Sequence, residues 1–414
     1  MAIPILNLLF RGLAIAGRFL VLIGIGRYLS ETELGIYGLF YTSIILAIYF
    51  IGLDFYTYNT REIIGREYTE RLPLLRDQLV FHLLVYLVAI PLLLPVFYYD
   101  VIPFRFIIWF YLILIFEHLS QEFFRIFTAL SKSVFANFIT FIRSGAWVFV
   151  LAIAWIMHIE SLINLHTIWI AWFLGSFVSV IISVIYLFKL NLGTIKHNRV
   201  NWPWIKKGIL ISLPFFVSSL CFRLIEHTNR YFIDFFQSKD LVGIFTLFAS
   251  SANLISVIVF TTIIMVDYPV LYEYYIHRQN EDYLKRKKKF IRKVIYISLA
   301  AGILAAVLIH PLLYLIGKHE IYDPHIIVFY ILIGANILYN LSLIPHYLLY
   351  IKKKDYQIMI TTLAGLVVSL ILNYLLVLWF AITGAALTML ISFFVILTLK
   401  WIIYKRDVVR DETG

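Results

Sequence analysis

Long apolar runs of similar length recur along the whole chain. A helix that crosses the hydrocarbon core of a bilayer needs roughly 20 consecutive, mostly apolar residues. Short polar segments separate the runs that meet this requirement. We therefore predict twelve transmembrane helices, at about residues 3–27, 36–60, 79–98, 104–125, 134–157, 166–188, 208–235, 242–268, 291–316, 325–350, 356–380 and 382–403.

The composition agrees with a membrane location and excludes a fully soluble protein. Of the 414 residues, 62% are hydrophobic and 14% are charged, and the mean hydropathy is +0.89. Soluble domains carry about 45–50% apolar and about 25% charged residues. In a bilayer only helices or closed barrels satisfy the backbone, and these runs are too long and too evenly apolar for barrel strands. The sequence therefore predicts an all-α polytopic membrane protein.

The basic residues predict its orientation. Most of the 35 Lys and Arg residues lie in the loops after runs 2, 4, 6, 8 and 10 and at the C-terminal end. The alternate loops hold only Arg27, Arg105, Lys239 and Lys318. Because cytoplasmic loops carry the excess of Lys and Arg, we expect both termini in the cytoplasm. The same bias accounts for the net charge of +11 without a nucleic-acid partner.

An internal repeat indicates two lobes. Residues 28–40 resemble residues 236–248 at an offset of 208, with Ser30 matching Ser238 and Gly35 matching Gly243. Each segment is the outward turn between the first two helices of its half. We therefore expect an N-terminal lobe at 1–190, a cytoplasmic linker at 191–206 and a C-terminal lobe at 207–414. Two six-helix lobes of this kind enclose a central cavity suited to alternating access.

Charged residues inside the spans are candidate functional residues, because each costs at least about 2.5–3.5 kcal/mol on insertion scales. Asn7, Arg11 and Arg18 share one face of the first predicted helix. The seventh carries a polar stripe at similar spacing, which consists of Ser219, Arg223, Glu226, His227, Arg230 and Asp234. The offset of 208 superposes the two stripes, so we expect both to face the cavity. Local pairing could neutralise the second stripe, whereas the first has no acid on its own helix.

The remaining candidates lie in the N-terminal half. Arg143 has no acid at helical spacing, and Asp54, Glu117 and Glu122 lie deep in their spans. Two interpretations of these acids, and of Glu226 and Asp234, stay open: they couple transport to protons or Na⁺, or they are counter-charges for the arginines. His310 and His346, each next to a proline, are expected to be packing groups, as is the single cysteine, Cys221.

The excess of arginine over acid indicates an anionic cargo. The planar guanidinium bonds two phosphate oxygens at once, and an aromatic content of 17% offers surfaces for sugars and lipid chains. A phosphate-bearing amphiphile with sugars fits these features, and a flat apolar cation fits them poorly. We expect the phosphate to be held by the five intramembrane arginines, Arg11, Arg18, Arg143, Arg223 and Arg230. No catalytic residue, metal site or cofactor is predicted.

Three segments resemble a known family. They are RFLVLIGIGRYLSETELGIYGLF at 18–40, GLDFYTYNTREIIGR at 52–66 and FFRIFTALSKSVFANFITFIRSGAW at 123–147. They are similar to the polysaccharide-transporter branch of the multidrug/oligosaccharidyl-lipid/polysaccharide exporter superfamily, which includes flippases of O-antigen and capsular repeat units. The resemblance implies transfer of an undecaprenyl-pyrophosphate-linked oligosaccharide from the inner to the outer leaflet of the bacterial cytoplasmic membrane, with cavity arginines engaging the pyrophosphate. Other polysaccharide-assembly proteins are possible partners.

Two other functions stay open. A polytopic O-antigen polymerase or ligase would also have about twelve spans, but such enzymes carry a large outward loop that this sequence lacks. A drug/cation antiporter of the same superfamily would share the layout, and the excess of arginine argues against it. We therefore expect a transporter and not an enzyme.

Overall fold

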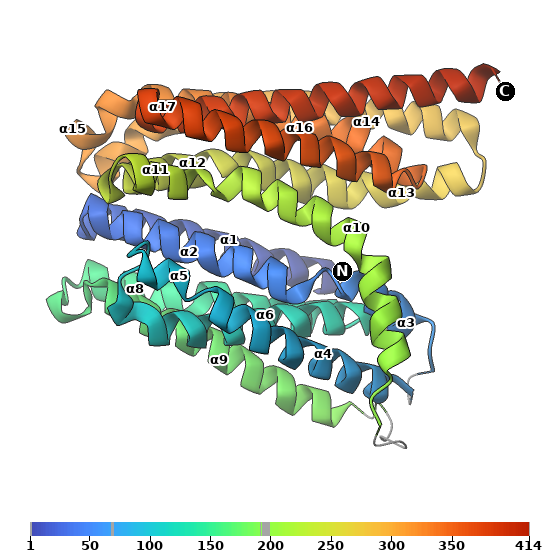
Figure 1. Cartoon of the computed structure of the whole chain (residues 1–414), viewed down its shortest axis with the longest axis horizontal. Coiled ribbons are helices and arrows are strands. Elements are labelled where there is room, and N and C mark those ends of the chain that lie inside the picture. Colours follow the sequence, from blue (N-terminus) through green and yellow to red (C-terminus); the bar gives the residue numbers. More distant parts are fainter. Residues whose placement is uncertain (1, 68–69, 191, 193–198, 414) are drawn as a thin grey trace. The chain divides into compact units, whose positions relative to one another are not determined.

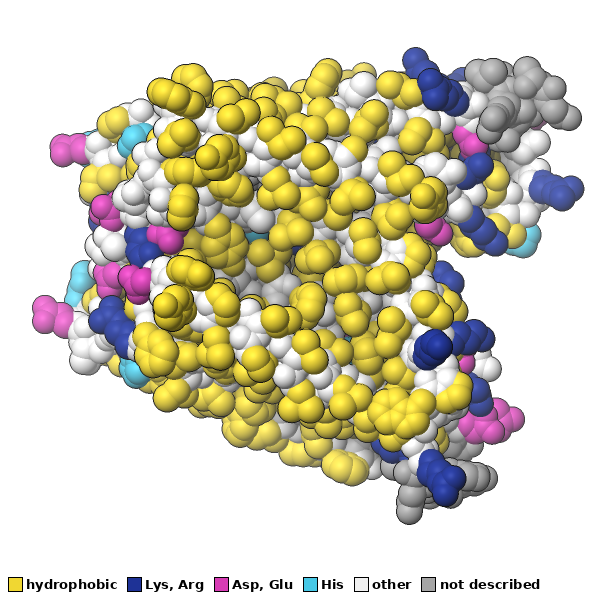
Figure 2. All heavy atoms as spheres, viewed as in Figure 1, with side chains coloured by type: hydrophobic (Ala, Val, Ile, Leu, Met, Phe, Trp, Pro, Cys, Tyr) yellow, Lys and Arg dark blue, Asp and Glu magenta, His cyan; other side chains and the backbone are white. Residues whose placement is uncertain are grey.

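The computed structural model describes residues 2–67, 70–190, 192 and 199–413, the first three and last six of them by backbone alone (Figure 1). Every secondary-structure element in this part of the chain is helical. On the face drawn in Figure 2, hydrophobic side chains cover the middle of the helices and charged side chains gather at the helix ends. Large apolar side chains such as Leu87, Ile153 and Leu304 are exposed on their helices. The pattern fits helices surrounded by lipid.

The N-terminal half contains the first six predicted spans. Its elements are α1 (Ala2–Tyr28), α2 (Glu31–Gly52), α3 (Tyr56–Ile64), α4 (Arg71–Leu92), α5 (Pro95–Tyr98), η2 (Phe104–Phe106), α6 (Ile107–Ala129), α7 (Ser133–Phe141), the π-helical turn η3 (Ile142–Ala146), α8 (Trp147–Ile156), η4 (Glu160–Leu162) and α9 (Leu165–Lys189). Helices α7, η3 and α8 run on as one span, and α6 packs against α2, α7 and α9.

The C-terminal half repeats this plan. Its elements are α10 (Trp202–His227), α11 (Asn229–Phe236), α12 (Lys239–Val259), η5 (Phe260–Ile264), α13 (Met265–Ile276), α14 (Asn280–Ile316), α15 (His319–Tyr322), η6 (Asp323–His325), α16 (Ile326–Ile351) and α17 (Asp355–Thr413). The fourth span of this half, α16, packs against α12, α14 and α17, as α6 does against its neighbours. The same position is thus central in both halves.

Helix α17 contains two spans that meet at a single residue. Ala381 has the non-helical angles φ 47° and ψ −131°, and the chain is helical on both sides of it. Gly384 allows the two arms to approach, because a Cβ there would lie 2.0 Å from the carbonyl oxygen of Leu376. With this break counted, the eleven helical stretches long enough to cross a membrane contain twelve spans. The prediction of an all-α protein with twelve spans is confirmed.

Two compact units make up the chain, one up to Phe216 and one from Val217 onward, and the division falls inside α10. The linker was expected at 191–206. Residues 191 and 193–198 of that range lie outside the described residues, and from Trp202 the chain is already helical. The exact lobe boundaries stay a prediction.

The repeated outward turn has a common structural role. Ser30 is the N-cap of α2, and its Oγ accepts a hydrogen bond from the backbone N–H of Glu33 at 3.2 Å. The Glu33 side chain in turn accepts from the backbone N–H of Ser30, which completes a capping box. Ser238 caps α12 in the same way, with its Oγ accepting from the N–H of Leu241 at 3.3 Å. Because a serine side chain satisfies an otherwise unpaired N–H at a helix start, both halves keep serine here.

Glycines bring α1 against the span formed by α7, η3 and α8. A Cβ added to Gly17 would lie 2.7 Å from the Cα of Gly145, and a Cβ on Gly24 would overlap the ring of Trp155. Small residues let membrane helices approach closely, and van der Waals packing is the main attraction between them. The position of α1 in its unit therefore depends on these glycines.

This packing gives a direct stability test. We expect Gly17→Ala to lower the thermal unfolding midpoint of the purified protein in detergent, because overpacking a tight contact costs about 1–3 kcal/mol. Gly12→Ala is the matched control on the same helix, since nothing lies within 4 Å of a Cβ at that position. Equal midpoints for the two variants would contradict the close contact between α1 and η3.

Candidate functional site

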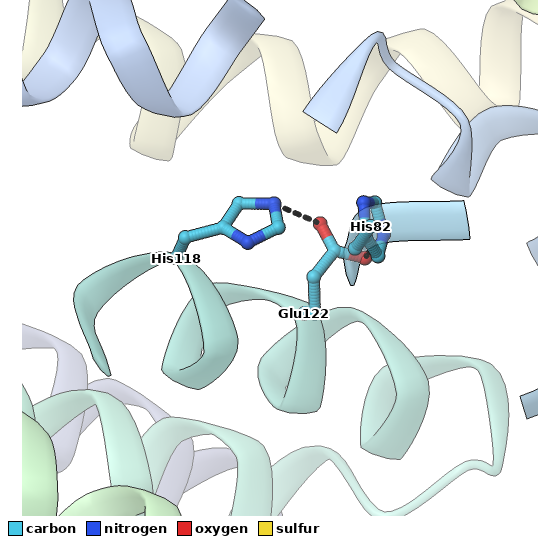
Figure 3. A group of neighbouring side chains, drawn as sticks. All are labelled: His82, His118 and Glu122. Atoms are coloured by element: carbon cyan, nitrogen blue, oxygen red, sulfur yellow. Dashed lines mark ion pairs between the residues drawn. The ribbon is translucent and has the colours of Figure 1, made fainter. Parts of the chain in front are cut away.

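A buried polar cluster lies in the N-terminal unit, where α4 and α6 face each other. Gln78, His82 and Tyr86 recur every four residues along α4, so they share one face of that helix. His118, Glu122 and Arg125, spaced by four and then three residues, share one face of α6. Figure 3 shows His118 and His82 on either side of the Glu122 carboxylate. His82, His118 and Glu122 are 2%, 0% and 5% exposed, so this polar group lies inside the protein.

Glu122 is the centre of the cluster. Its Oε2 accepts a hydrogen bond from Nε2 of Gln78 at 2.6 Å and lies 3.6 Å from Nε2 of His82. Its Oε1 pairs with Nη1 of Arg125 and lies 3.8 Å from Nε2 of His118. Both carboxylate oxygens therefore face nitrogen atoms, and Arg125 neutralises the charge.

Neighbouring groups orient these side chains. The hydroxyl of Tyr86 lies 2.6 Å from Nδ1 of His118 and 3.4 Å from the carbonyl oxygen of Ile115. The amide of Asn59 on α3 donates to Oε1 of Gln78, which turns the Gln78 amine toward Glu122. The cluster thus links α3, α4 and α6.

A break in the second span lies beside the cluster. Leu53 and Asp54, between α2 and α3, both have left-handed backbone angles, with φ of 45° and 47°. Residues other than glycine rarely adopt this conformation, and such strain persists only where the surroundings fix it. A Cβ on Gly52 would lie 3.7 Å from Arg125 Nη1 and from His118 Nε2. The guanidinium of Arg125 also stacks over the ring of Tyr56, the first residue of α3, at 3.9 Å.

Arg143 and Glu117 form a second buried pair. Arg143 lies in the π-helical turn η3 and is 6% exposed, with its Nε 3.4 Å from Oε1 of Glu117. The other carboxylate oxygen accepts hydrogen bonds from Trp172 at 3.1 Å and Ser176 at 2.9 Å. The sequence showed no acid near Arg143 because its partner lies on another helix. Glu117 is therefore the counter-charge of Arg143 in this structure.

Arg11 and Arg18 on α1 have a different environment. Arg11 is half-buried and Arg18 is exposed. Asn7, one turn before Arg11, bonds to Ser133 at 3.2 Å and to Asn137 at 2.8 Å, so this end of the stripe packs on α7. Within the described residues no carboxylate lies within the 4.0 Å ion-pair distance of Arg18. It is thus an exposed cation in the middle of an apolar span.

The polar stripe of the C-terminal unit is largely paired. Nη1 of Arg223 lies 2.6 Å from Oε2 of Glu226. Nε of Arg230 donates to Oγ1 of Thr246 at 3.1 Å, and its guanidinium lies over the ring of Phe245. Asp234 pairs with Lys239 at 2.9 Å. Arg230 is 4% exposed, and Arg223 is half-buried.

Lys400 was missed by the sequence reasoning, which grouped it with the basic residues of the cytoplasmic end. It is 5% exposed, and its Nζ lies 3.1 Å from Nδ1 of His346. His346, expected to be a packing group, is the polar partner of this buried lysine. Neither residue stands out in the sequence, because the contact joins α16 to the second arm of α17.

Comparisons with known proteins identify the family. Residues 6–275 match the sequence model of a family described as "Polysaccharide biosynthesis protein". The chain belongs to this family. The resemblance to the polysaccharide-transporter branch of the superfamily is thereby confirmed. No curated protein sequence is a significant match.

Solved structures show the same fold. An inward-facing multidrug resistance MATE transporter of the MOP superfamily matches with a TM-score of 0.80 and 15% identity, covering 98% of this chain and 95% of that one. An outward-facing structure of such a transporter matches with a TM-score of 0.63 and 14% identity, covering 98% of this chain and 94% of that one. A MOP superfamily transporter from Pyrococcus furiosus matches with a TM-score of 0.62 and 14% identity, covering 97% of this chain and 93% of that one. This member of the polysaccharide biosynthesis family is a multi-pass membrane protein with a transporter fold.

The structure thus separates the predicted site residues of this protein into groups. Arg143, Glu117 and Glu122 are paired inside the N-terminal unit, and Asp54 is buried at the α2–α3 break. His82 and Gln78 were missed, although their spacing of four residues within an apolar helix was a usable signal. The cargo role of the five arginines stays a prediction.

The Arg143–Glu117 pair can be tested by a double-mutant cycle. We expect Arg143→Met alone to lower thermal stability strongly, because breaking a buried ion pair costs about 3–5 kcal/mol. Arg143→Met combined with Glu117→Met should recover much of that loss, since no charge is then left unpaired. The unfolding midpoints of the wild type, both single variants and the double variant measure this coupling. Additive losses would show that the two side chains do not interact.

Proposed function

We propose that this transporter is a flippase for a lipid-linked oligosaccharide. The cargo is an undecaprenyl-pyrophosphate-linked oligosaccharide that moves from the inner to the outer leaflet of the bacterial cytoplasmic membrane by alternating access. Its transport would serve O-antigen, capsule or exopolysaccharide assembly. Membership of the polysaccharide biosynthesis family supports a cargo of this class.

Arg18 is the observation that carries the proposal. An exposed guanidinium in the middle of an apolar span is costly unless water or an anion solvates it. A pyrophosphate offers several oxygens to the planar fork of arginine, and the sugars and lipid of such a cargo match a surface rich in aromatic and aliphatic side chains. An organic cation would be repelled by the same residue, which argues against a drug/cation antiporter.

The five arginines then have unequal roles. Arg11, Arg18 and Arg223 are the most accessible and are proposed to contact the phosphates directly. Arg143 and Arg230 are buried, so each would reach the cargo only after a change in its present contacts. Both termini are proposed to lie in the cytoplasm, because the basic loops and the C-terminal end share one side.

A transport assay tests the role of Arg18. We expect Arg18→Ala to abolish flipping of undecaprenyl-pyrophosphate-linked oligosaccharide in cells that lack their own flippase, with the labelled lipid accumulating in the inner leaflet. Arg18→Lys should keep partial activity, because the charge remains but the two-oxygen geometry is lost. Arg27→Ala is the control, since Arg27 is an exposed residue in the last turn of the same helix.

The protein level in the membrane must be equal for all variants. Mass spectrometry of lipids that co-purify with the wild type provides an independent measurement. Full transport by Arg18→Ala and by the Arg11→Ala, Arg18→Ala double variant would show that this stripe does not bind the cargo.

A further inference from the structure

The histidine–glutamate cluster of the N-terminal unit contains two imidazole rings with unsatisfied nitrogen atoms. The ring centres of His82 and His118 lie 4.8 Å apart, and each ring presents Nε2 to a different oxygen of Glu122. Nδ1 of His82 and Nε2 of His118 are buried and have no hydrogen-bond partner among the described residues. Buried polar atoms of this kind are rare and call for an explanation.

The unsatisfied nitrogen of His118 can be explained by asking which of its two ring nitrogens carries a hydrogen. A neutral imidazole has one N–H donor and one acceptor. If Nδ1 carries the hydrogen, it donates to Tyr86 and a bare Nε2 faces the Glu122 carboxylate, so two acceptors oppose each other. If Nε2 carries the hydrogen, Tyr86 must donate its hydroxyl hydrogen to Nδ1. Its hydrogen bond to the carbonyl oxygen of Ile115 is then lost. In the doubly protonated ring, Nδ1 can donate to Tyr86 while Tyr86 donates to Ile115, and the charged Nε2–H side faces the Glu122 carboxylate at 3.8 Å.

The charges leave room for one added proton. The charges of Glu122 and Arg125 cancel, so this group of side chains has no net charge when both histidines are neutral. Across the break, Asp54 interacts electrostatically with Arg125. A second proton would place two imidazolium groups side by side, which is unfavourable. The cluster is therefore built to hold one extra positive charge.

We propose that His82 and His118 share one transported proton, with Glu122 as their common counter-ion, and that loading this proton weakens the Glu122–Arg125 pair beside the α2–α3 break. The inference rests on the proposed transport function and names its coupling ion. The proton enters from water on one side of the membrane and leaves to water on the other. On loading, an O–H bond of hydronium breaks as an N–H bond of an imidazole forms, and release reverses this exchange.

Arg125 connects the proton to the helix break. It contacts Glu122 on α6 and stacks on Tyr56 at the start of α3, while Asp54 interacts with it from the segment between α2 and α3. An imidazolium next to Glu122 weakens the attraction of Arg125 to Glu122. The attraction of Arg125 to Asp54 then becomes relatively stronger. The change acts on Leu53 and Asp54, the two strained residues where the second span is interrupted. Transporter helices are commonly interrupted at such ion sites.

A divalent metal ion fits the cluster less well. Two imidazoles and a carboxylate with ligand atoms within 4.8 Å of one another are a possible ligand set. However, Arg125 already occupies one oxygen of Glu122, and its positive charge would repel a dication at this distance. Gln78 donates to the other oxygen. A proton needs no displacement of either partner.

Nitrogen-15 NMR of the histidine-labelled, full-length protein in lipid nanodiscs tests the site directly. His82→Asn and His118→Asn assign the two rings. We expect the pair to take up one proton as the pH is lowered, because histidine is the side chain suited to reversible protonation. Glu122→Gln should lower the midpoint by about 1–3 pH units, because a nearby negative charge is lost. Glu160→Gln, in the exposed turn η4, should leave it unchanged.

Three results would overturn the proton site. One is that both rings stay neutral over the whole pH range. Another is a midpoint that does not respond to Glu122→Gln. The third is a stoichiometric metal ion in the purified wild type that is lost in His82→Asn, which would make the cluster a metal site.

Proteoliposomes with a fluorescent undecaprenyl-pyrophosphate-linked oligosaccharide test the coupling. We expect a proton gradient to accelerate flipping by the wild type and by Glu160→Gln, and to have no effect on the His82→Asn, His118→Asn double variant. That variant keeps the Glu122–Arg125 pair, so it remains informative if Glu122→Gln does not fold. Gradient-dependent flipping by the double variant would refute the coupling. A wild type that does not flip this lipid would refute the proposed function, whereas the NMR titration would still decide whether the site binds a proton.

Discussion

Charge buried in an apolar medium must be compensated, and this constraint determines most of the polar architecture of the protein. Removing one partner of a buried ion pair costs about 3–5 kcal/mol, so each acid deep in the N-terminal unit lies next to a specific base. Glu117 holds Arg143, and Glu122 holds Arg125. The Arg143–Glu117 pair joins η3 to α6, so these two segments cannot shift independently without separating charges, whereas Glu122 and Arg125 lie one turn apart on α6. Arg18 is the exception, because it is exposed and no carboxylate among the described residues lies within ion-pair distance of it.

Close backbone contact complements this pairing. Between apolar helices in lipid there is no hydrophobic driving force, so shape and van der Waals contact decide which helices meet. Gly17 and Gly145 bring α1 against η3, the turn that carries Arg143. A π-helical turn contains one extra residue and changes the direction of the side chains around it. The packing of α1 and the placement of the Arg143–Glu117 pair are therefore parts of one arrangement.

The sequence was sufficient for the features that repeat or extend over many residues. The twelve spans follow from hydropathy alone, and the match between Ser30 and Ser238 reflects two equivalent helix caps. Contacts between helices could not be predicted from the sequence, because helical spacing identifies partners only on the same helix. Arg143 therefore seemed unpaired, and Lys400 could not be connected to His346. His82 was overlooked since a lone histidine in an apolar run is ordinary until its neighbour across the bundle is known.

Ala381 has a consequence for how the protein is made. A connection of one residue cannot hold the first arm of α17 in the membrane while the second waits outside, because the two helices meet without a loop. The two arms must therefore enter the bilayer together, as a helical hairpin. Synthesis of the last two spans then ends in a single insertion event.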